Sequence, residues 1–154
     1  MAKTRGVVFA DGPCAGIFWG VEFRGTVKER QTMIRKLKFV SIPVRDQDRA
    51  VDFYVNKLGF TLVTDQPMGP GQRWVEIRPP KGDTGVALFT PPGQENRVGT
   101  FTGISMDCDD VQKTYDEFKA RGVEFEKPPK AEPWGVMAIM KDSEGNQIVL
   151  SSSR

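Results

Sequence analysis

The sequence predicts an α+β domain made of two tandem copies of one module, each in the order strand, helix, strand, strand, strand. Two observations carry this prediction. The order of the periodic segments in residues 36–90 returns in residues 101–151, and the residues that begin and end the two helices are equally spaced. With 154 residues the chain fits one such domain and excludes a large multidomain enzyme.

The first module is predicted over residues 36–90. Residues 38–44 alternate between polar and apolar side chains, as a half-buried strand does. Asp46 can cap the helix that follows, and Gly59 ends it. Turn-forming segments rich in glycine and proline then separate three further predicted strands, at residues 60–65, 73–78 and 85–90.

The second module is predicted over residues 101–151, after a linker at residues 91–100. A strand at residues 101–108 leads to a helix capped by Asp109 and ended by Gly122. Three more strands are expected near Val123, Val136 and Ile148.

The helix boundaries indicate an internal duplication. Asp46 and Asp109 lie 63 residues apart, and so do Gly59 and Gly122. Aspartate caps free helix amides and glycine accepts a left-handed turn, so each pair marks the same structural position twice.

Residues 1–32 do not share this periodicity, and the domain proper is predicted over residues 33–154. The first 32 residues are interpreted as an N-terminal extension. Because Met33 stands directly before the first strand, one hypothesis is that they extend the reading frame beyond the natural start. Asp11 and Pro13 cut the apolar run at residues 6–10 well below the usual length, so an export signal is not expected.

Composition narrows the possible functions. No apolar run reaches the roughly 20 residues of a membrane helix, and the net charge of +2 gives no strong field for nucleic acid. Histidine is absent, which removes the commonest proton shuttle and transition-metal ligand. Cys14 and Cys108 lie far apart and lack the spacing of zinc ligands. Two such cysteines do not indicate a disulfide framework, so a reducing cytoplasm is expected. The partner predicted by elimination is a small molecule, without a cofactor.

Side chains alternate across a strand, so each predicted strand offers two sets. One set is aliphatic and is predicted to form a core beneath the helices. The other set mixes small, polar and aromatic residues: Phe39, Ser41, Trp74, Glu76, Arg78, Gly85, Ala87, Phe89, Gly103, Ser105, Asp107, Gln147, Val149 and Ser151. Such a face is either a solvated sheet surface or the wall of a ligand site, and its apolar members favour the ligand site.

The segments FVSIPVRDQDRAVDFYVNKLGF, WVEIRPPKGDTGVALFTP, DDVQKTYDEFKARGVEF and KDSEGNQIVL resemble the vicinal oxygen chelate superfamily. This group includes glyoxalases, bleomycin-resistance proteins and extradiol dioxygenases. The resemblance covers residues 36–151. It implies a curved mixed sheet that forms a cup, with the helices outside, and a homodimer.

Metal-dependent members of this superfamily hold a divalent ion with four side chains, one on the first and one on the last strand of each module. Carried over by the resemblance, those positions fall on Phe39, Ala87, Gly103 and Val149. None of the four offers an oxygen or nitrogen lone pair, so no metal is expected. A small apolar void is expected in its place, as in the antibiotic-binding members.

Three functions remain open from the sequence. The first is a metal-independent protein that binds an amphipathic small molecule in this cup. The second is a glyoxalase-like lyase or isomerase with Glu76 as general base. The third is an interaction module whose sheet face another chain covers. The ligand-binding residues predicted for the first function are Phe39, Ser41, Trp74, Glu76, Arg78, Ala87, Phe89, Gly103, Ser105, Trp134 and Val149.

Overall fold

A computed structural model describes residues 34–153. The chain separates into Met1–Arg35 and Lys36–Arg154, and every described helix and strand belongs to the second unit. The predicted extension at residues 1–32 lies outside the described residues. No helix among the described residues is long and apolar enough to cross a membrane.

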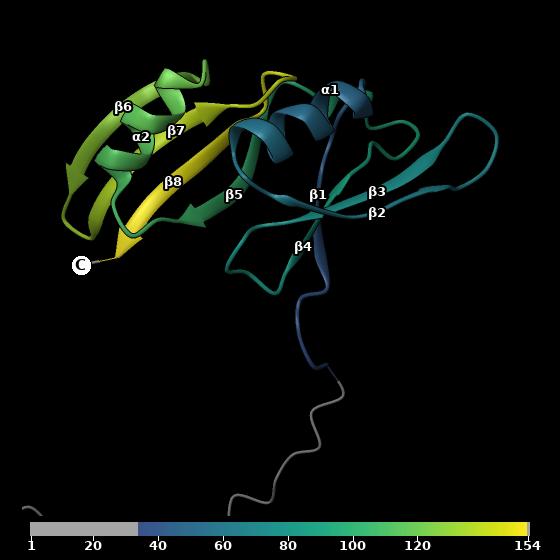
Figure 1. Ribbon diagram of the computed structural model, residues 1–154, viewed down its shortest axis with the longest axis horizontal. Helices are drawn as coiled ribbons and strands as arrows, with labels where there is room; N and C mark the ends of the chain where they lie inside the picture. Colours follow the sequence, from purple (N-terminus) through teal and green to yellow (C-terminus); the bar gives the residue numbers. More distant parts are fainter. Residues whose placement is uncertain (1–33, 154) are drawn as a thin grey trace, which may run out of the picture. The chain divides into compact units, whose positions relative to one another are not determined.

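Two four-stranded mixed sheets form the unit, one from each predicted module (Figure 1). The first sheet has the order β1-β4-β3-β2 and the second has the order β5-β8-β7-β6. The first strand of each module pairs in parallel with the last strand of the same module, and the other pairings are antiparallel. The α+β prediction and the module order are therefore confirmed.

The first module contains β1 (Phe39–Ile42), α1 (Gln47–Asp52), β2 (Thr61–Pro67), β3 (Arg73–Arg78) and β4 (Gly85–Leu88). Helix α1 continues into a wider π-helical turn, Phe53–Lys57. Asp46 caps it as expected, because its carboxylate accepts a hydrogen bond from the Arg49 amide. Gly59 follows at φ +78°, a backbone conformation that glycine adopts without steric cost.

The second module contains β5 (Phe101–Asp107), α2 (Val111–Ala120), β6 (Glu124–Glu132), β7 (Gly135–Lys141) and β8 (Gln147–Ser153). A short 3-10 turn, Glu95–Arg97, precedes it in the linker.

The predicted cap of the second helix is wrong by one residue. Asp110 accepts the hydrogen bond from the Lys113 amide at 2.9 Å, and Asp109 is exposed and pairs with Lys81 instead. Two adjacent aspartates are equally good caps by residue type, so the sequence alone does not distinguish them.

One core joins both modules beneath the helices. Its fully buried members include Ile42, Val75 and Ile77 from the first sheet and Ile148 and Leu150 from the second. Most of the aliphatic set predicted from the alternation therefore forms the core, whereas Val40, Ile104, Met106 and Cys108 are only partly buried against it.

A buried polar network also connects the two modules. Asp142, in the turn between β7 and β8, accepts hydrogen bonds from the Tyr54 hydroxyl at 2.8 Å and from the Asn146 side chain at 2.8 Å. Asn146 in turn donates to the Pro43 carbonyl and accepts from the Gly99 amide. Burial and the neighbouring Asp142 charge hold the pKa of Tyr54 well above its usual range, so the hydroxyl stays a donor.

Candidate functional site

The two faces of the first sheet differ as the alternation predicts. On β3, Val75 and Ile77 are fully buried, whereas Trp74 and Glu76, which alternate with them, are partly exposed. Because β1 and β4 flank β3 on one side of the sheet order, residues of all three strands meet on this second face. It is the face that the sequence assigns to a ligand.

Three aromatic rings are packed together on this face, and we call Phe39, Trp74 and Phe89 the aromatic face. The Phe39 and Trp74 ring centroids lie 5.0 Å apart at an interplanar angle of 75°. Trp74 and Phe89 lie 5.9 Å apart at 45°. Such edge-to-face and tilted contacts stabilise aromatic groups beyond their buried area. Phe39 is 37% exposed, so a planar ligand can reach this edge of the aromatic face.

Two small residues beside the rings have structural contacts. Ser41 donates a 2.9 Å hydrogen bond from its hydroxyl to the Phe89 carbonyl, which ties β1 to the end of β4. Ala87 is opposite both Ser41 and Glu76 in the strand register and is fully buried. A ligand would therefore reach Ala87 only if the side chains around it moved.

The charged pair on this face is Glu76 and Arg78. The nearest Arg78 nitrogen, Nη2, is 3.8 Å from Glu76 Oε1, which is an ion-pair distance but too long for a hydrogen bond. The Glu76 side chain is only 12% exposed, and that of Arg78 is 44% exposed. Gly85 lies directly beneath the Glu76 carboxylate, since a Cβ placed there would approach Oε1 to 2.4 Å.

The predicted site residues of the second module lie on the second sheet. Gly103 and Ser105 are exposed on β5, Val149 is half-buried on β8, and the Ser105 and Ser151 hydroxyls are hydrogen-bonded at 2.9 Å. Gly103 has φ +72° where the β5 to β8 register shifts, so the strand is irregular there. Trp134 is 55% exposed in the turn between β6 and β7.

The structure thus brings the predicted residues together in two sets, one on each sheet. The set on the first sheet is in mutual contact through its aromatic rings and the Glu76–Arg78 pair. The apolar void predicted between Phe39, Ala87, Gly103 and Val149, and the role of Trp134 in stacking, stay predictions.

The metal positions carried over from the resemblance do not fit a divalent ion. A benzyl group, a methyl group, a hydrogen atom and an isopropyl group cannot donate lone pairs. Within residues 34–153, no three histidine, cysteine, aspartate or glutamate side chains converge as ligands.

Two cavities on the helix-covered side were not predicted. An apolar groove of ≈ 670 Å³ lies between the modules. Its apolar walls include Val40, Phe60, Ile104, Met106, Phe118 and Leu150. The sequence placed several of these side chains in the core, but alternation alone does not tell a filled core from one with a gap.

Polar groups border this groove. Lys81 of the first module and Asp109 of the second form an ion pair of 3.0 Å, and both side chains are almost fully exposed. Cys108 also lines the groove, and its burial raises the pKa of the thiol. A thiol in that state is a poor nucleophile.

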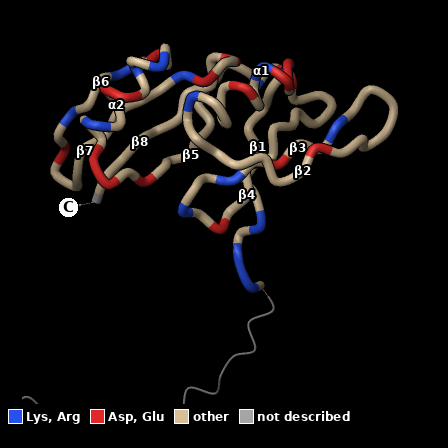
Figure 2. Tube along the Cα trace, viewed as in Figure 1, with Lys and Arg blue, Asp and Glu red and all other residues tan. Residues whose placement is uncertain are grey.

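The second cavity is a polar cleft of ≈ 360 Å³, also between the modules. Arg49, Lys57 and Lys141 line it together with Asp52 and Glu124. Arg49 pairs with Glu144 and Lys141 with Glu126, so two of the three cations already have carboxylate partners. Figure 2 shows both basic and acidic residues along the described chain.

Comparison with known proteins gives a family. Residues 36–150 match the model described as the Glyoxalase/Bleomycin resistance protein/Dioxygenase superfamily. The uncharacterized protein YetH of Bacillus subtilis is 32% identical over 118 residues, which cover 77% of this chain and 98% of YetH.

Solved structures agree with this match. A member of the same superfamily from Sphaerobacter thermophilus is 40% identical, with a TM-score of 0.73, and the match covers 79% of this chain and 99% of that one. TnmS3, an antibiotic binding protein from Streptomyces sp. CB03234, is 34% identical with a TM-score of 0.69, over 79% of this chain and 98% of TnmS3.

Proposed function

Because the chain belongs to the glyoxalase/bleomycin resistance protein/dioxygenase superfamily, we propose that it binds an amphipathic small molecule without a metal, on the aromatic face of the first sheet. The observation that carries the proposal is the contact of Phe39, Trp74 and Phe89 on a partly exposed sheet face. Exposed aromatic groups that are already packed lose little conformational entropy when a ligand stacks on them.

The superfamily contains enzymes as well as binding proteins, so membership alone does not decide between them. Two further observations support binding. TnmS3, which is described as an antibiotic binding protein, is 34% identical to this chain. The four positions that the resemblance assigns to metal in the catalytic relatives carry side chains without donor atoms here.

A second copy of the chain is part of this proposal. The resemblance implies a homodimer, in which the set on the first sheet and the set on the second sheet, with Trp134, belong to composite cups. Size-exclusion chromatography with light scattering tests this at micromolar concentration, and a monomer at all concentrations would contradict it.

The binding proposal is tested by calorimetric titration with a panel of amphipathic aromatic compounds, antibiotics included. Trp74→Ala should weaken binding of any hit at least about tenfold, because a stacking partner is lost. Tyr115→Leu is the matched control, since Tyr115 lies on α2 against Phe125 and should leave binding unchanged. Binding that depends on added zinc or nickel, or that is lost when EDTA is added, would contradict metal independence.

A further inference from the structure

The Glu76 carboxylate occupies the space that a side chain at position 85 would fill, because residue 85 is glycine. An ideal Cβ on Gly85 would lie 2.4 Å from Glu76 Oε1 and 2.9 Å from its Cδ, far inside contact distance. Gly85 is opposite Phe39 in the strand register. The carboxylate is therefore held against the sheet, next to the strand that carries one ring of the aromatic face.

This carboxylate differs from two other shielded carboxylates among the described residues, Glu144, which pairs with Arg49, and Asp142. Asp142 is 7% exposed and accepts four hydrogen bonds, from the Tyr54 hydroxyl, the Asn146 side chain and the amides of Glu144 and Asn146. Glu76 is 12% exposed at its side chain, yet no residue within 34–153 donates a hydrogen bond to it. The ion pair that it forms among them is with Arg78, at 3.8 Å.

A carboxylate that is mostly shielded from water is unfavourable until donors reach it. At Asp142 the protein supplies those donors. At Glu76 it supplies a nearby charge without a hydrogen bond, and the aromatic face lies on the same side of the sheet. A donor group on a molecule placed on that face would complete this environment.

We propose that the aromatic face selects ring compounds that carry a protonated amine, and that Glu76 accepts the hydrogen bond from the ammonium group. This inference rests on the proposed function and specifies its ligand class. An ammonium donates charge-assisted hydrogen bonds, which are about twice as strong as neutral ones. It is also attracted to the faces of nearby indole and phenyl rings.

The alternative ligand class is an anion that binds to Arg78. Its guanidinium is 44% exposed, so an anionic ligand could reach it, but the same ligand would then approach the Glu76 carboxylate. The Glu76 carboxylate lies against the sheet beside the aromatic face, whereas Arg78 extends toward water. The structure therefore favours a cationic group next to the aromatic rings over an anionic one.

Three naphthalene probes test the inference, since they share one ring system and differ in one group: 1-naphthylmethylamine, 1-naphthalenemethanol and 1-naphthoic acid. In calorimetric titrations at pH 7 and low salt, the amine should bind about tenfold more tightly than the alcohol. The acid should bind most weakly.

Two variants localise the preference. Glu76→Gln keeps the shape of the side chain and should bring the affinity for the amine down to that for the alcohol, with the alcohol changed less than about threefold. Gly85→Ala should have the same effect without changing any charge, because its methyl group displaces the carboxylate. Asp83→Asn, which removes an exposed negative charge in the connection between β3 and β4, should leave all three affinities unchanged.

The outcomes separate the two proposals. If none of the probes binds, the aromatic face is not a ligand site and both proposals are overturned. If the three probes bind equally, or the acid binds best, binding survives and the selection by Glu76 is overturned. Circular dichroism of each variant confirms folding, and Glu76→Gln remains decisive if Gly85→Ala does not fold.

Discussion

The Tyr54 hydroxyl of the first module donates a 2.8 Å hydrogen bond to the Asp142 carboxylate of the second, in a fully buried setting. Tyr54→Phe removes this donor and leaves the carboxylate one partner short. We expect the free energy of unfolding, measured in urea, to fall by about 1–3 kcal/mol. Tyr115→Phe is the control, because Tyr115 packs against Phe125 through its ring, and it should change stability by less than about 0.5 kcal/mol.

The same tyrosine predicts an alkaline effect. Its pKa is raised in the folded state, so the unfolded chain loses the proton first as pH rises above about 10. The contribution of Tyr54 to stability is complete below that pH and declines above it. Stability of the wild type should therefore fall more steeply than that of Tyr54→Phe between pH 9.5 and 11, and parallel curves would contradict the assignment.

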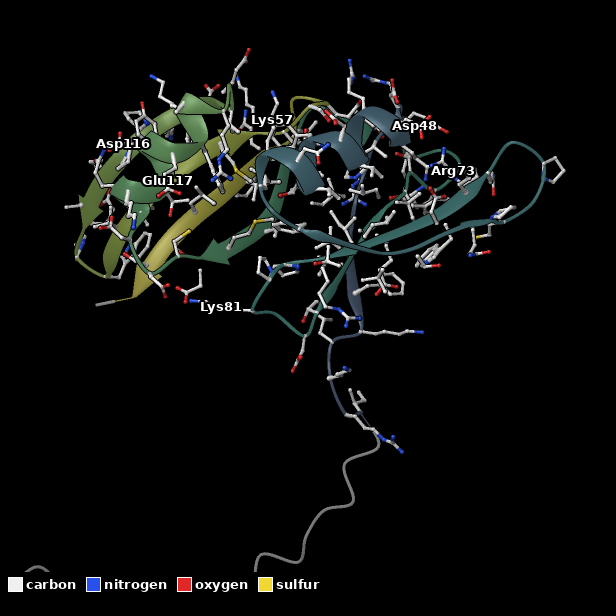
Figure 3. All side chains as sticks on the ribbon, viewed as in Figure 1. Asp48, Lys57, Arg73, Lys81, Asp116 and Glu117 are labelled. Atoms are coloured by element: carbon white, nitrogen blue, oxygen red, sulfur yellow. The ribbon has the colours of Figure 1, made fainter. Side chains whose placement is uncertain are left out.

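Arg73 holds two carboxylates at the start of β3. It donates to Asp65 at 2.9 and 2.6 Å and to Asp48 at 2.8 Å, and Asp48 and Arg73 lie close together in Figure 3. The guanidinium lowers the pKa of Asp65, so this stabilisation is present above the unfolded carboxyl pKa near 4 and is lost as pH falls through the folded value.

Arg73→Ala should therefore lower the urea midpoint at pH 7, and the difference from the wild type should shrink as the pH falls from 4 to 2. Lys81→Ala is the matched control, because Lys81 and Asp109 form a single, almost fully exposed pair. Such pairs contribute little, so this variant should follow the wild type at every pH. A constant difference for Arg73→Ala across the range would show that the charge is not responsible.

The cap of α2 provides a direct comparison of two neighbouring aspartates. Asp110→Ala should lower the free energy of unfolding by about 1 kcal/mol, because the Lys113 amide loses its acceptor. Asp109→Ala loses only the exposed pair with Lys81 and should change little. Thermal unfolding followed by circular dichroism distinguishes them, and the reverse order would restore Asp109 as the cap.

Cys108 should react slowly with alkylating agents. Its thiol is half-buried in the apolar groove and its pKa is raised by burial, so little thiolate is present at pH 7.5. In a Cys14→Ser background, the rate of modification by iodoacetamide should lie at least about tenfold below that of free cysteine at the same pH. A rate equal to that of free cysteine would mean that the groove does not shield the thiol.

Much of the fold is predictable because it follows from local rules. Alternation places Val75 and Ile77 in the core and Trp74 on the opposite face, as the structure confirms. The turn at Gly59 follows from its freedom at positive φ. The superfamily resemblance read from the residues is confirmed by the match over residues 36–150.

Other features depend on contacts between distant residues, so local patterns do not reveal them. The Tyr54–Asp142 bond joins residues 88 positions apart, and the groove forms only where the two modules leave a gap. The choice of Asp110 over Asp109 depends on one backbone conformation. The candidate site is only partly predictable from the sequence. Alternation groups Trp74 with Glu76, but it does not show that Glu76 lies over Gly85.

The parallel pairing of the first and last strand in each module has a consequence for biosynthesis. On the ribosome, β1 has no parallel strand to pair with until β4 has been made, as far as Leu88. The Tyr54 hydroxyl lacks its hydrogen-bond acceptor until Asp142 has left the exit tunnel. The first sheet can close while the second half is still being translated, but the joint between the halves cannot form before Asp142 has been made. The second sheet needs β8 for its own parallel pair, so it closes only after β8 has been made, and the two halves are built one after the other along the chain.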